Sequence, residues 1–158
     1  MSGNVRKALE KLEYGAYVIT AHHGNDRGGI FANLVTQVSF DPPLVAVAIR
    51  KGRPIEAMIA ESGAFALNVL SKGQMDLVHR FVRRSEPGED RFAGVAVEVK
   101  ATGSPILSDA LAYLDCRLLT SYAPGDHTLF IGEVVDGDVL REGQPLTVGE
   151  VNLHYRGR

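Results

Sequence analysis

The sequence contains a single cysteine, Cys116, and no tryptophan among its 158 residues. One cysteine cannot form a disulfide within the chain, so a reducing compartment is the simplest expectation. A thiol nucleophile stays open, but Cys116 alternates with Leu114 and Leu118, which favours a core position. Scattered histidines do not have the spacing of zinc ligands, and the adjacent His22 and His23 should point to opposite faces of a strand. We therefore expect no metal site.

A large charge imbalance and a long apolar run are also missing. The formal net charge is −2, which argues against a nucleic-acid partner or a polybasic membrane anchor. No apolar run approaches the roughly 20 residues of a membrane span, and residues 1–15 lack the apolar centre of a signal peptide. Neither a phosphate-binding P-loop nor a G-x-G-x-x-G motif is present. We expect a soluble, cytoplasmic protein that binds neither nucleic acid nor a membrane.

What the sequence does contain is an alternation of strand-like segments and turn residues over a length typical of one domain, residues 1–158. Apolar spacing predicts short helices at 4–13 and 54–61, and a capping box formed by Ser71 and Gln74 predicts a third helix that extends to about residue 82. A turn is expected at 25–29 and an exposed loop at 83–90. Strands are expected at 14–22, 30–40, 44–49, 65–70, 95–99, 111–122 and 128–140. This order predicts a mainly antiparallel, barrel-like β-sheet with a few short flanking helices.

The expected strand at 30–40 has an unusual polar face. Side chains alternate along a strand, so Asn33, Gln37 and Ser39 should share one face while the other face is almost entirely apolar. This pattern is typical of an antiparallel strand with one solvated face. It equally describes a polar wall for a flat ligand, since amide groups offer both donors and acceptors. The pattern alone leaves both interpretations open.

The next strand leads directly into a basic turn, Arg50-Lys51-Gly52-Arg53, which precedes an expected helix that begins at Pro54. Helix N-termini present N–H groups and partial positive charge, which suits a phosphate. Gly52 allows the backbone to approach a ligand closely. A basic surface loop is the plain alternative. Taken with the polar strand, the turn favours a phosphate pocket beside a wall of amides, as a nucleotide-like cofactor requires.

Five segments from about residue 14 to residue 135 resemble, in the same order, the flavin reductase-like family of FMN-binding split barrels. The segments are GIFANLVTQVSFDPPLVAVAI, ESGAFALNVLS, HRF, RFAGV and GDHTLFIGEV. The resemblance implies an antiparallel split β-barrel and a homodimer that holds FMN, or FAD, near the subunit interface. It also implies NAD(P)H as the electron donor and allows a monooxygenase or an electron-transfer protein as partner.

The resemblance further implies roles for individual residues. Ser39 would lie near the ribityl-phosphate end of the flavin, and His127 near the nicotinamide. The basic turn, through Arg50, Lys51 and Arg53, would hold the phosphate. The isoalloxazine would be lined, largely through main-chain groups, by Ala32, Asn33, Leu34, Val35 and Thr36.

The chain departs from the commoner family pattern at three places. Leu34 stands where many members have a serine, and Pro54 stands where many have a serine or threonine early in the helix. The C-terminal aromatic and basic segment is shortened to HYRGR at 154–158.

Three hypotheses follow: two functions that use a flavin, and a binding function for a different ligand. The first is an NAD(P)H-dependent flavin reductase that supplies reduced flavin to a monooxygenase. Such an enzyme needs no catalytic carboxylate, because the flavin itself accepts the hydride. The second is a flavoredoxin-like FMN electron carrier reduced by a partner protein, which is motivated by Leu34 and the short C-terminal segment. The third is a split barrel that binds haem or a pyridoxal-type phosphate.

Overall fold

The computed structural model describes residues 1–151, so the predicted role of HYRGR at 154–158 lies outside the described residues. The helices are α1 (Gly3–Leu9), α2 (Pro54–Ser62), α3 (Met75–Val82) and α4 (Val148–Val151). The strands are β1 (Tyr17–His23), β2 (Asp26–Ala32), β3 (Val35–Ser39), β4 (Leu44–Arg50), β5 (Ala64–Val69), β6 (Val97–Val99), β7 (Pro105–Leu107), β8 (Ala112–Tyr122) and β9 (His127–Val139). No helix of this described part is long and apolar enough to cross a membrane.

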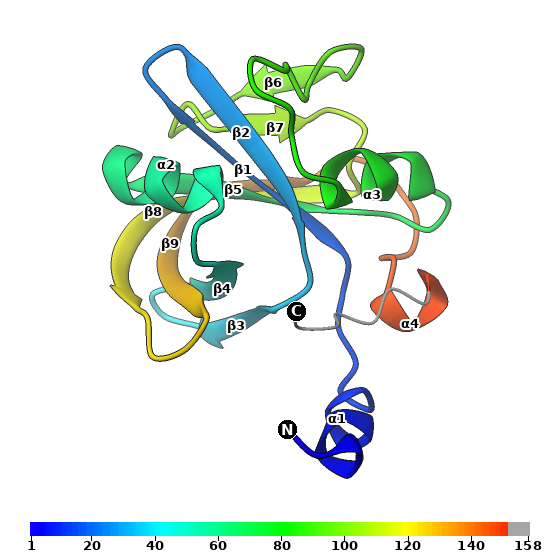
Figure 1. The fold of residues 1–158 in the computed structure, drawn as a ribbon. Helices are drawn as coiled ribbons and strands as arrows, with labels where there is room; N and C mark the ends of the chain where they lie inside the picture. The colour runs from blue at the N-terminus through cyan, green and yellow to red at the C-terminus, as the bar shows by residue number, and fades with distance from the viewer. Residues whose placement is uncertain (152–158) are drawn as a thin grey trace.

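One antiparallel sheet organises the molecule, with seven strands in the order β2-β1-β5-β8-β9-β4-β3, while β6 and β7 form a separate pair. The edge strands β2 and β3 follow each other in the chain, joined by Asn33 and Leu34. The sheet therefore curves back towards its own start without pairing its edges. In Figure 1, β2 crosses the front of the curved sheet, with α2 and α3 on either side of it. The predicted mainly β, split-barrel fold is confirmed.

Two large apolar clusters fill the two sides of the sheet, and β1, the strand next to the edge strand β2, contributes to both. Ile19 packs inside the barrel with Val47, Phe65 and Phe130, whereas the preceding Val18 packs on the other side in the cluster beneath α3. Each fully buried side chain of this size contributes about 1.5–3 kcal/mol to folding. These clusters hold β2, β4 and the turn before α2 in fixed relative positions.

The predicted continuous strand at 30–40 is wrong. Asn33 and Leu34 leave the β1 ladder after Ala32 and cross to the opposite edge of the sheet, where Val35 pairs with Val47. The Val35 N–H donates to the Asn33 carbonyl oxygen at 3.0 Å, which tightens this crossing. Single-strand alternation could not show it, because both sides of the break remain extended. We call Asn33 and Leu34 the crossover link.

The predicted turn at 25–29 is wrong in its position. The hairpin turns at Gly24 and Asn25, and Gly24 takes a left-handed φ of 59°. Gly28 and Gly29 lie inside β2 instead. A Cβ atom on Gly29 would come within 2.7 Å of Phe81 on α3, so this glycine allows a helix to approach the strand.

Most other expected elements are confirmed with shifted ends. The helix at 54–61 is α2, and it ends at Gly63 in a left-handed conformation. The helix expected after Ser71 begins only at Met75, although the Ser71 N–H does donate to Gln74 Oε1 at 2.9 Å. The short strand β7 was not expected. Cys116 is fully buried, which raises its pKa to about 12 and confirms the predicted core position over a thiol nucleophile.

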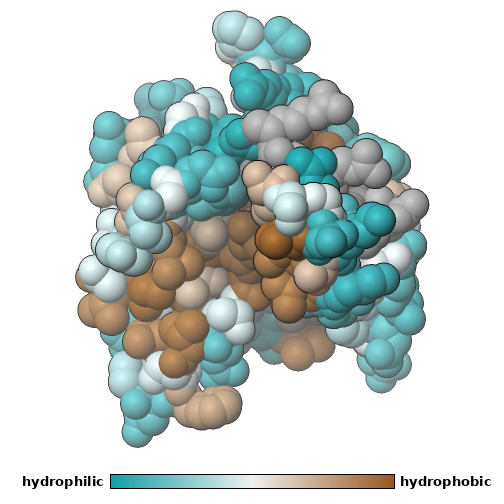
Figure 2. All heavy atoms as spheres, turned by 60° about the horizontal axis from the view of Figure 1, so that its bottom comes forward, coloured by the Kyte–Doolittle hydropathy of each residue, from teal (hydrophilic) through white to brown (hydrophobic). Residues whose placement is uncertain are grey.

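Large apolar side chains are exposed on several strands of the sheet. Figure 2, in which the bottom of Figure 1 is turned forward, shows apolar side chains gathered around a hollow. Six large apolar side chains are exposed on β3, on the turn after it, and on β8 and β9: Val38, Phe40, Leu119, Tyr122, Val135 and Val139. Val139 pairs with Ala112 at the far end of β9, and we call the other five the exposed apolar set.

Candidate functional site

The basic turn lies where β4 ends and α2 begins. Gly52 has a φ of 83°, a left-handed conformation that glycine adopts readily, and Pro54 occupies the first helical turn. The Glu56 carboxylate accepts the Gly52 N–H and the Thr128 hydroxyl, both at 2.7 Å. One N–H of the turn is therefore already bound by a carboxylate, and anion binding here relies mainly on the cationic side chains.

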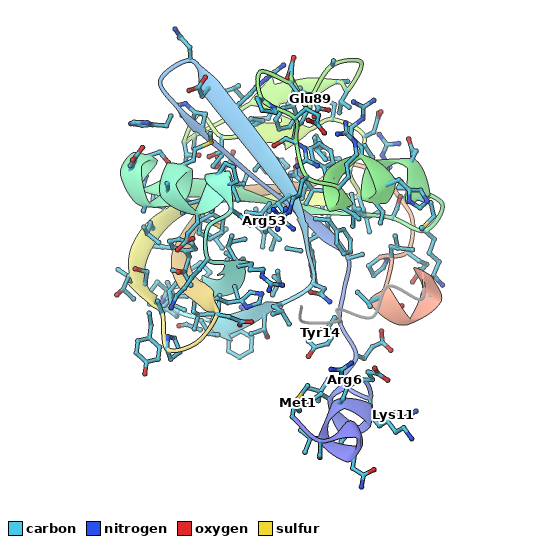
Figure 3. All side chains as sticks on the ribbon, in the orientation of Figure 1. Met1, Arg6, Lys11, Tyr14, Arg53 and Glu89 are labelled. Atoms are coloured by element: carbon cyan, nitrogen blue, oxygen red, sulfur yellow. The ribbon has the colours of Figure 1, made fainter. Side chains whose placement is uncertain are left out.

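The basic turn forms one wall of a cavity of about 370 Å³. A second wall comes from β2, and a third comes from the loop after α3. Figure 3 labels Arg53 beside β2 and Glu89 in that loop above it. The cavity is lined by Arg27, Gly28, Gly29, Ile30, Arg50, Lys51, Gly52, Arg53, Pro54, Ile55, Met58, Arg84, Ser85, Glu89 and Arg91. We call this space the cationic cavity, because six of its lining residues are arginine or lysine and one is acidic.

Neighbouring ion pairs offset part of this positive charge. Glu89 forms an ion pair with Arg83, which lies outside the cavity lining, and this hydrogen-bonded guanidinium lowers the pKa of Glu89 to about 2. Arg27 forms an ion pair with Asp90 at 3.1 Å. Beyond these pairs the cavity keeps a clear excess of positive charge, which suits an anionic ligand.

Two arginines of the cavity keep a buried donor without an acceptor. Within residues 1–151, the Nε atoms of Arg53 and Arg91 are buried and have no hydrogen-bond partner. Arg91 is only 8% exposed. Its pKa is lowered, first by burial and then by the nearby cation of Arg83, with a smaller effect from Arg53. Buried unpaired donors are costly, and an anion in the cavity would relieve that cost.

The crossover link lies between two walls of the cavity along the chain. It follows Ile30 and Ala32 of β2, and the Leu34 carbonyl oxygen accepts the Ala48 N–H at 2.9 Å, two residues before Arg50. Asn33 is buried, at 6% exposed, whereas Thr36 is exposed. The link is thus hydrogen-bonded to β4 two residues before the basic turn, but none of the predicted isoalloxazine residues lines the cationic cavity itself.

The structure does not bring Ser39 together with the basic turn. Ser39 pairs with Leu44 at the start of β4, whereas Arg50 is at its end, six positions further along. At a rise of about 3.3 Å per residue, this separation is about 20 Å. Within one chain, Ser39 is therefore distant from the phosphate-binding residues that we predicted beside it.

His127, in contrast, lies directly beside the basic turn. It is the register partner of Arg50 in the β4–β9 ladder. Its Nδ1 is 2.7 Å from Asp126 Oδ1, and this hydrogen bond lowers the pKa of Asp126. The Lys51 N–H donates to the Asp126 carbonyl oxygen at 3.0 Å. The β8–β9 turn and the basic turn therefore form one connected unit.

Sequence reasoning missed the cations of the other two walls. Arg27 was assigned to a turn and Arg84 to an exposed loop, and Arg91 was given no role. Only Arg91 carried a local sign that it could be buried, because it directly precedes the apolar Phe92. That β2 and the loop after α3 face the basic turn follows from tertiary structure.

A model of the flavin reductase-like domain matches residues 9–157, nearly the whole chain. The chain belongs to the flavin reductase-like family. Its fold is therefore that of a flavin reductase-like domain. This membership favours flavin over haem or a pyridoxal-type phosphate as the ligand.

Curated relatives of this family member include larger fused proteins. Diflavin flavoprotein A 1 of Synechocystis sp. is 39% identical over 99% of this chain, which spans only 26% of that protein. High molecular weight rubredoxin of Moorella thermoacetica is 37% identical over 96% of this chain and 67% of that protein. The chain thus spans about a quarter of the diflavin relatives that it matches.

Solved structures of the family share the fold. The NADH:FAD oxidoreductase SgcE6 of Streptomyces globisporus C-1027 superposes with a TM-score of 0.84 at 30% identity. The match covers 90% of this chain and 86% of that protein.

Proposed function

We propose that this domain binds FMN and transfers electrons to it from NAD(P)H. The observation that carries the proposal is the cationic cavity, in which Arg53 presents a buried Nε donor without a protein partner beside the crossover link. This arrangement fits the phosphate of a flavin nucleotide, with FAD as the alternative flavin. The name of the NADH:FAD oxidoreductase relative supports a nicotinamide donor.

In this proposal two segments of the chain bind different parts of the flavin: the basic turn binds the phosphate and the crossover link binds the ring. Arg50, Lys51 and Arg53 bind the phosphate through charge-assisted hydrogen bonds. The crossover link lies against the isoalloxazine, and its rigid main-chain groups offer donors to the ring edge, where negative charge gathers on reduction. Leu34 supplies an apolar contact where many family members have a hydroxyl.

The bound flavin would supply the redox chemistry, by accepting a hydride from the nicotinamide. The chain has to orient the two rings and keep other geometries out. His127 lies beside Arg50 and is oriented by its hydrogen bond to Asp126, so it is the residue that we propose contacts the nicotinamide. A ring held from one nitrogen presents its other nitrogen in a fixed direction.

The proposal is tested by FMN titration and by oxidation of NADH and NADPH, using wild type, Arg53→Gln and the control Arg141→Gln. Arg141 is an arginine paired with Asp109 and lies outside the cationic cavity. Loss of a charge-assisted hydrogen bond, about 1.5–3 kcal/mol, weakens FMN binding roughly 10-fold to 150-fold. Unchanged FMN affinity in Arg53→Gln, or no nucleotide oxidation above a protein-free control, would contradict the proposal.

A second candidate function is an FMN electron carrier that receives electrons from a protein. It is favoured by the names of the curated relatives, a diflavin flavoprotein and a high molecular weight rubredoxin, and by Leu34. This function predicts tightly held FMN that NAD(P)H reduces slowly and that reduced rubredoxin reduces fast. Rapid turnover with NADH or NADPH alone would count against it.

We also propose that the domain is a homodimer and that a flavin reductase of this kind serves an oxygenase. The exposed apolar set supports the dimer, because contiguous apolar surface on a soluble protein usually marks an interaction site. Phe40 is 89% exposed and lies beside the edge strand β3, where a second copy would bury it. Because Ser39 also lies on β3, a dimer formed through this edge strand would place Ser39 of each copy at the interface with the other copy.

A further inference from the structure

We propose that the cationic cavity binds two phosphoryl groups at once. The first lies at the basic turn, and the second lies across the cavity at Arg84 and Arg91. The proposal rests on the flavin site proposed above and concerns what else that site recognises. A flavin mononucleotide brings one phosphate, so the second phosphoryl group comes from the pyrophosphate of FAD or from a nicotinamide dinucleotide.

The cations of the cavity come from separate walls. Arg53 belongs to the basic turn, whereas Arg84 and Arg91 belong to the loop after α3. Arg27, on the β2 wall, is offset by Asp90. The only lining carboxylate in the described chain, Glu89, is bound by Arg83. Two separate walls thus keep positive charge, through Arg53 on one and through Arg84 and Arg91 on the other.

Arg91, in the loop after α3, has the features of an anion-binding arginine rather than those of a basic surface residue. Its side chain is more than nine-tenths buried and its Nε donor has no partner among residues 1–151. The Nη2 atom donates to the carbonyl oxygens of Arg80 and Arg83, each at 2.7 Å, which fixes the guanidinium. The Phe81 ring supports it from one side, 5.4 Å away. An immobilised guanidinium with a buried unpaired donor is suited to bind an anion.

A purely structural role would account for only part of this arrangement. It explains the Nη2 contacts of Arg91 to the carbonyl oxygens at the end of α3, but it leaves the buried Nε atoms of both Arg53 and Arg91 without acceptors. Arg84 is exposed and lines the cavity, so its charge adds to a wall that already repels cations. Like charges held close together are stabilised by an anion placed between them.

The size of the cavity agrees with a larger ligand than one phosphate. About 370 Å³ lies within the range of roughly 300–1,000 Å³ that is typical of small-molecule sites. Ligands with one phosphoryl group reach one wall. Ligands with two linked phosphoryl groups reach both, so their affinity should depend on Arg84 while that of FMN should not.

The first experiment uses inorganic anions and needs no redox activity. Flavin-free protein is titrated with pyrophosphate and with phosphate, at low salt, by calorimetry. We expect pyrophosphate to bind at least 10-fold more tightly than phosphate, and Arg84→Gln to remove that preference. Arg141→Gln makes the same charge change outside the cavity and should keep it. No preference in wild type, or an unchanged preference in Arg84→Gln, would overturn the proposal even if the protein reduces flavin.

The second experiment identifies the source of the second phosphoryl group. Dissociation constants are measured for FMN and FAD, and then for NADH and NADPH with FMN-saturated protein. Arg84→Gln should leave the FMN value within twofold. It should weaken FAD at least fivefold if the flavin supplies the group, or a nicotinamide dinucleotide at least fivefold if the donor supplies it. Equal effects on all ligands, or none, would overturn the proposal. Failure of wild type to bind FMN would contradict the proposed function instead.

Arg91 provides a check that is independent of Arg84. Arg91→Lys retains the positive charge but replaces the planar guanidinium by a single ammonium, which cannot occupy the positions of both Nη2 and Nε. We expect this variant to lose the pyrophosphate preference as Arg84→Gln does. Because it also removes loop contacts, its thermal unfolding is measured in parallel. If Arg91→Lys folds and keeps the full preference, the second subsite is not at Arg91.

Discussion

Arginines 53 and 91 illustrate how burial changes the meaning of a basic residue. On the surface, a guanidinium gains little from a neighbouring charge. In the cationic cavity these two arginines keep buried Nε donors without acceptors, so the folded chain carries a cost that a ligand would remove. Glu89 differs from these arginines: it also lines the cavity, but its carboxylate already has a partner in Arg83.

The Arg83–Glu89 pair makes part of the stability of the loop dependent on pH. The pKa of Glu89 is lowered from 4.5 to about 2, so its contribution is complete above pH 4.5 and is lost as the pH falls towards 2. We expect Glu89→Gln to be less stable than wild type at pH 7, with a difference that shrinks between pH 4.5 and 2. Thermal unfolding across this range measures it. Glu86→Gln, in the same exposed loop, should show a much smaller difference at pH 7, and a pH-independent deficit in Glu89→Gln would contradict the account.

At this scale, local sequence predicted only one wall of the cavity. Arg50, Lys51 and Arg53 were identifiable because they cluster before a helix start. Arg91 was not, because its burial depends on Phe81 and on carbonyl oxygens at the C-terminal end of α3. The separation between Ser39 and the basic turn could not be predicted, since the register between β3 and β4 decides that distance and a sequence pattern does not contain it.

Among the elements, the crossover link is the feature that defines the split barrel. The chain was expected to continue as one strand through Asn33 and Leu34, because both sides of the break have strand-like residues. Long-range pairing overrides that local preference, with Ala32 paired to Tyr17 and Val35 paired to Val47. The helix α2 was predicted well, since Pro54 at its start and Gly63 at its end are local signals.

Close packing inside the barrel makes a specific prediction for β9. A Cβ atom on Gly132 would lie 2.6 Å from the Phe65 ring and 2.9 Å from the Cys116 Cβ. Gly132→Ala should therefore destabilise the fold by about 1–3 kcal/mol, as expected for an overpacked core. Gly125→Ala is the matched control, because no atom lies within 4 Å of its new Cβ. Denaturant unfolding compares the two variants, and equal stabilities would show that the barrel is not packed as described.

For the whole molecule, the exposed apolar set predicts self-association. Phe40→Asp places a charge in the expected interface and should weaken a homodimer at least 10-fold, about 1.4 kcal/mol. Val99→Asp is the control, because Val99 is 65% exposed but lies on the separate β6–β7 pair. Sedimentation velocity over a range of protein concentrations measures the association. A monomeric wild type, or an unchanged dimer in Phe40→Asp, would contradict the prediction.

As a whole, the molecule is proposed to be a redox domain that combines a flavin with a nicotinamide donor. The decisive experiment is anaerobic rapid mixing of FMN-loaded protein with NADH or NADPH, in which the flavin absorbance is followed. We expect the bound flavin to be bleached much faster than free FMN at the same concentration, by at least one of the two nucleotides. Bleaching no faster than free FMN with both nucleotides, or failure of the protein to retain FMN, would contradict it.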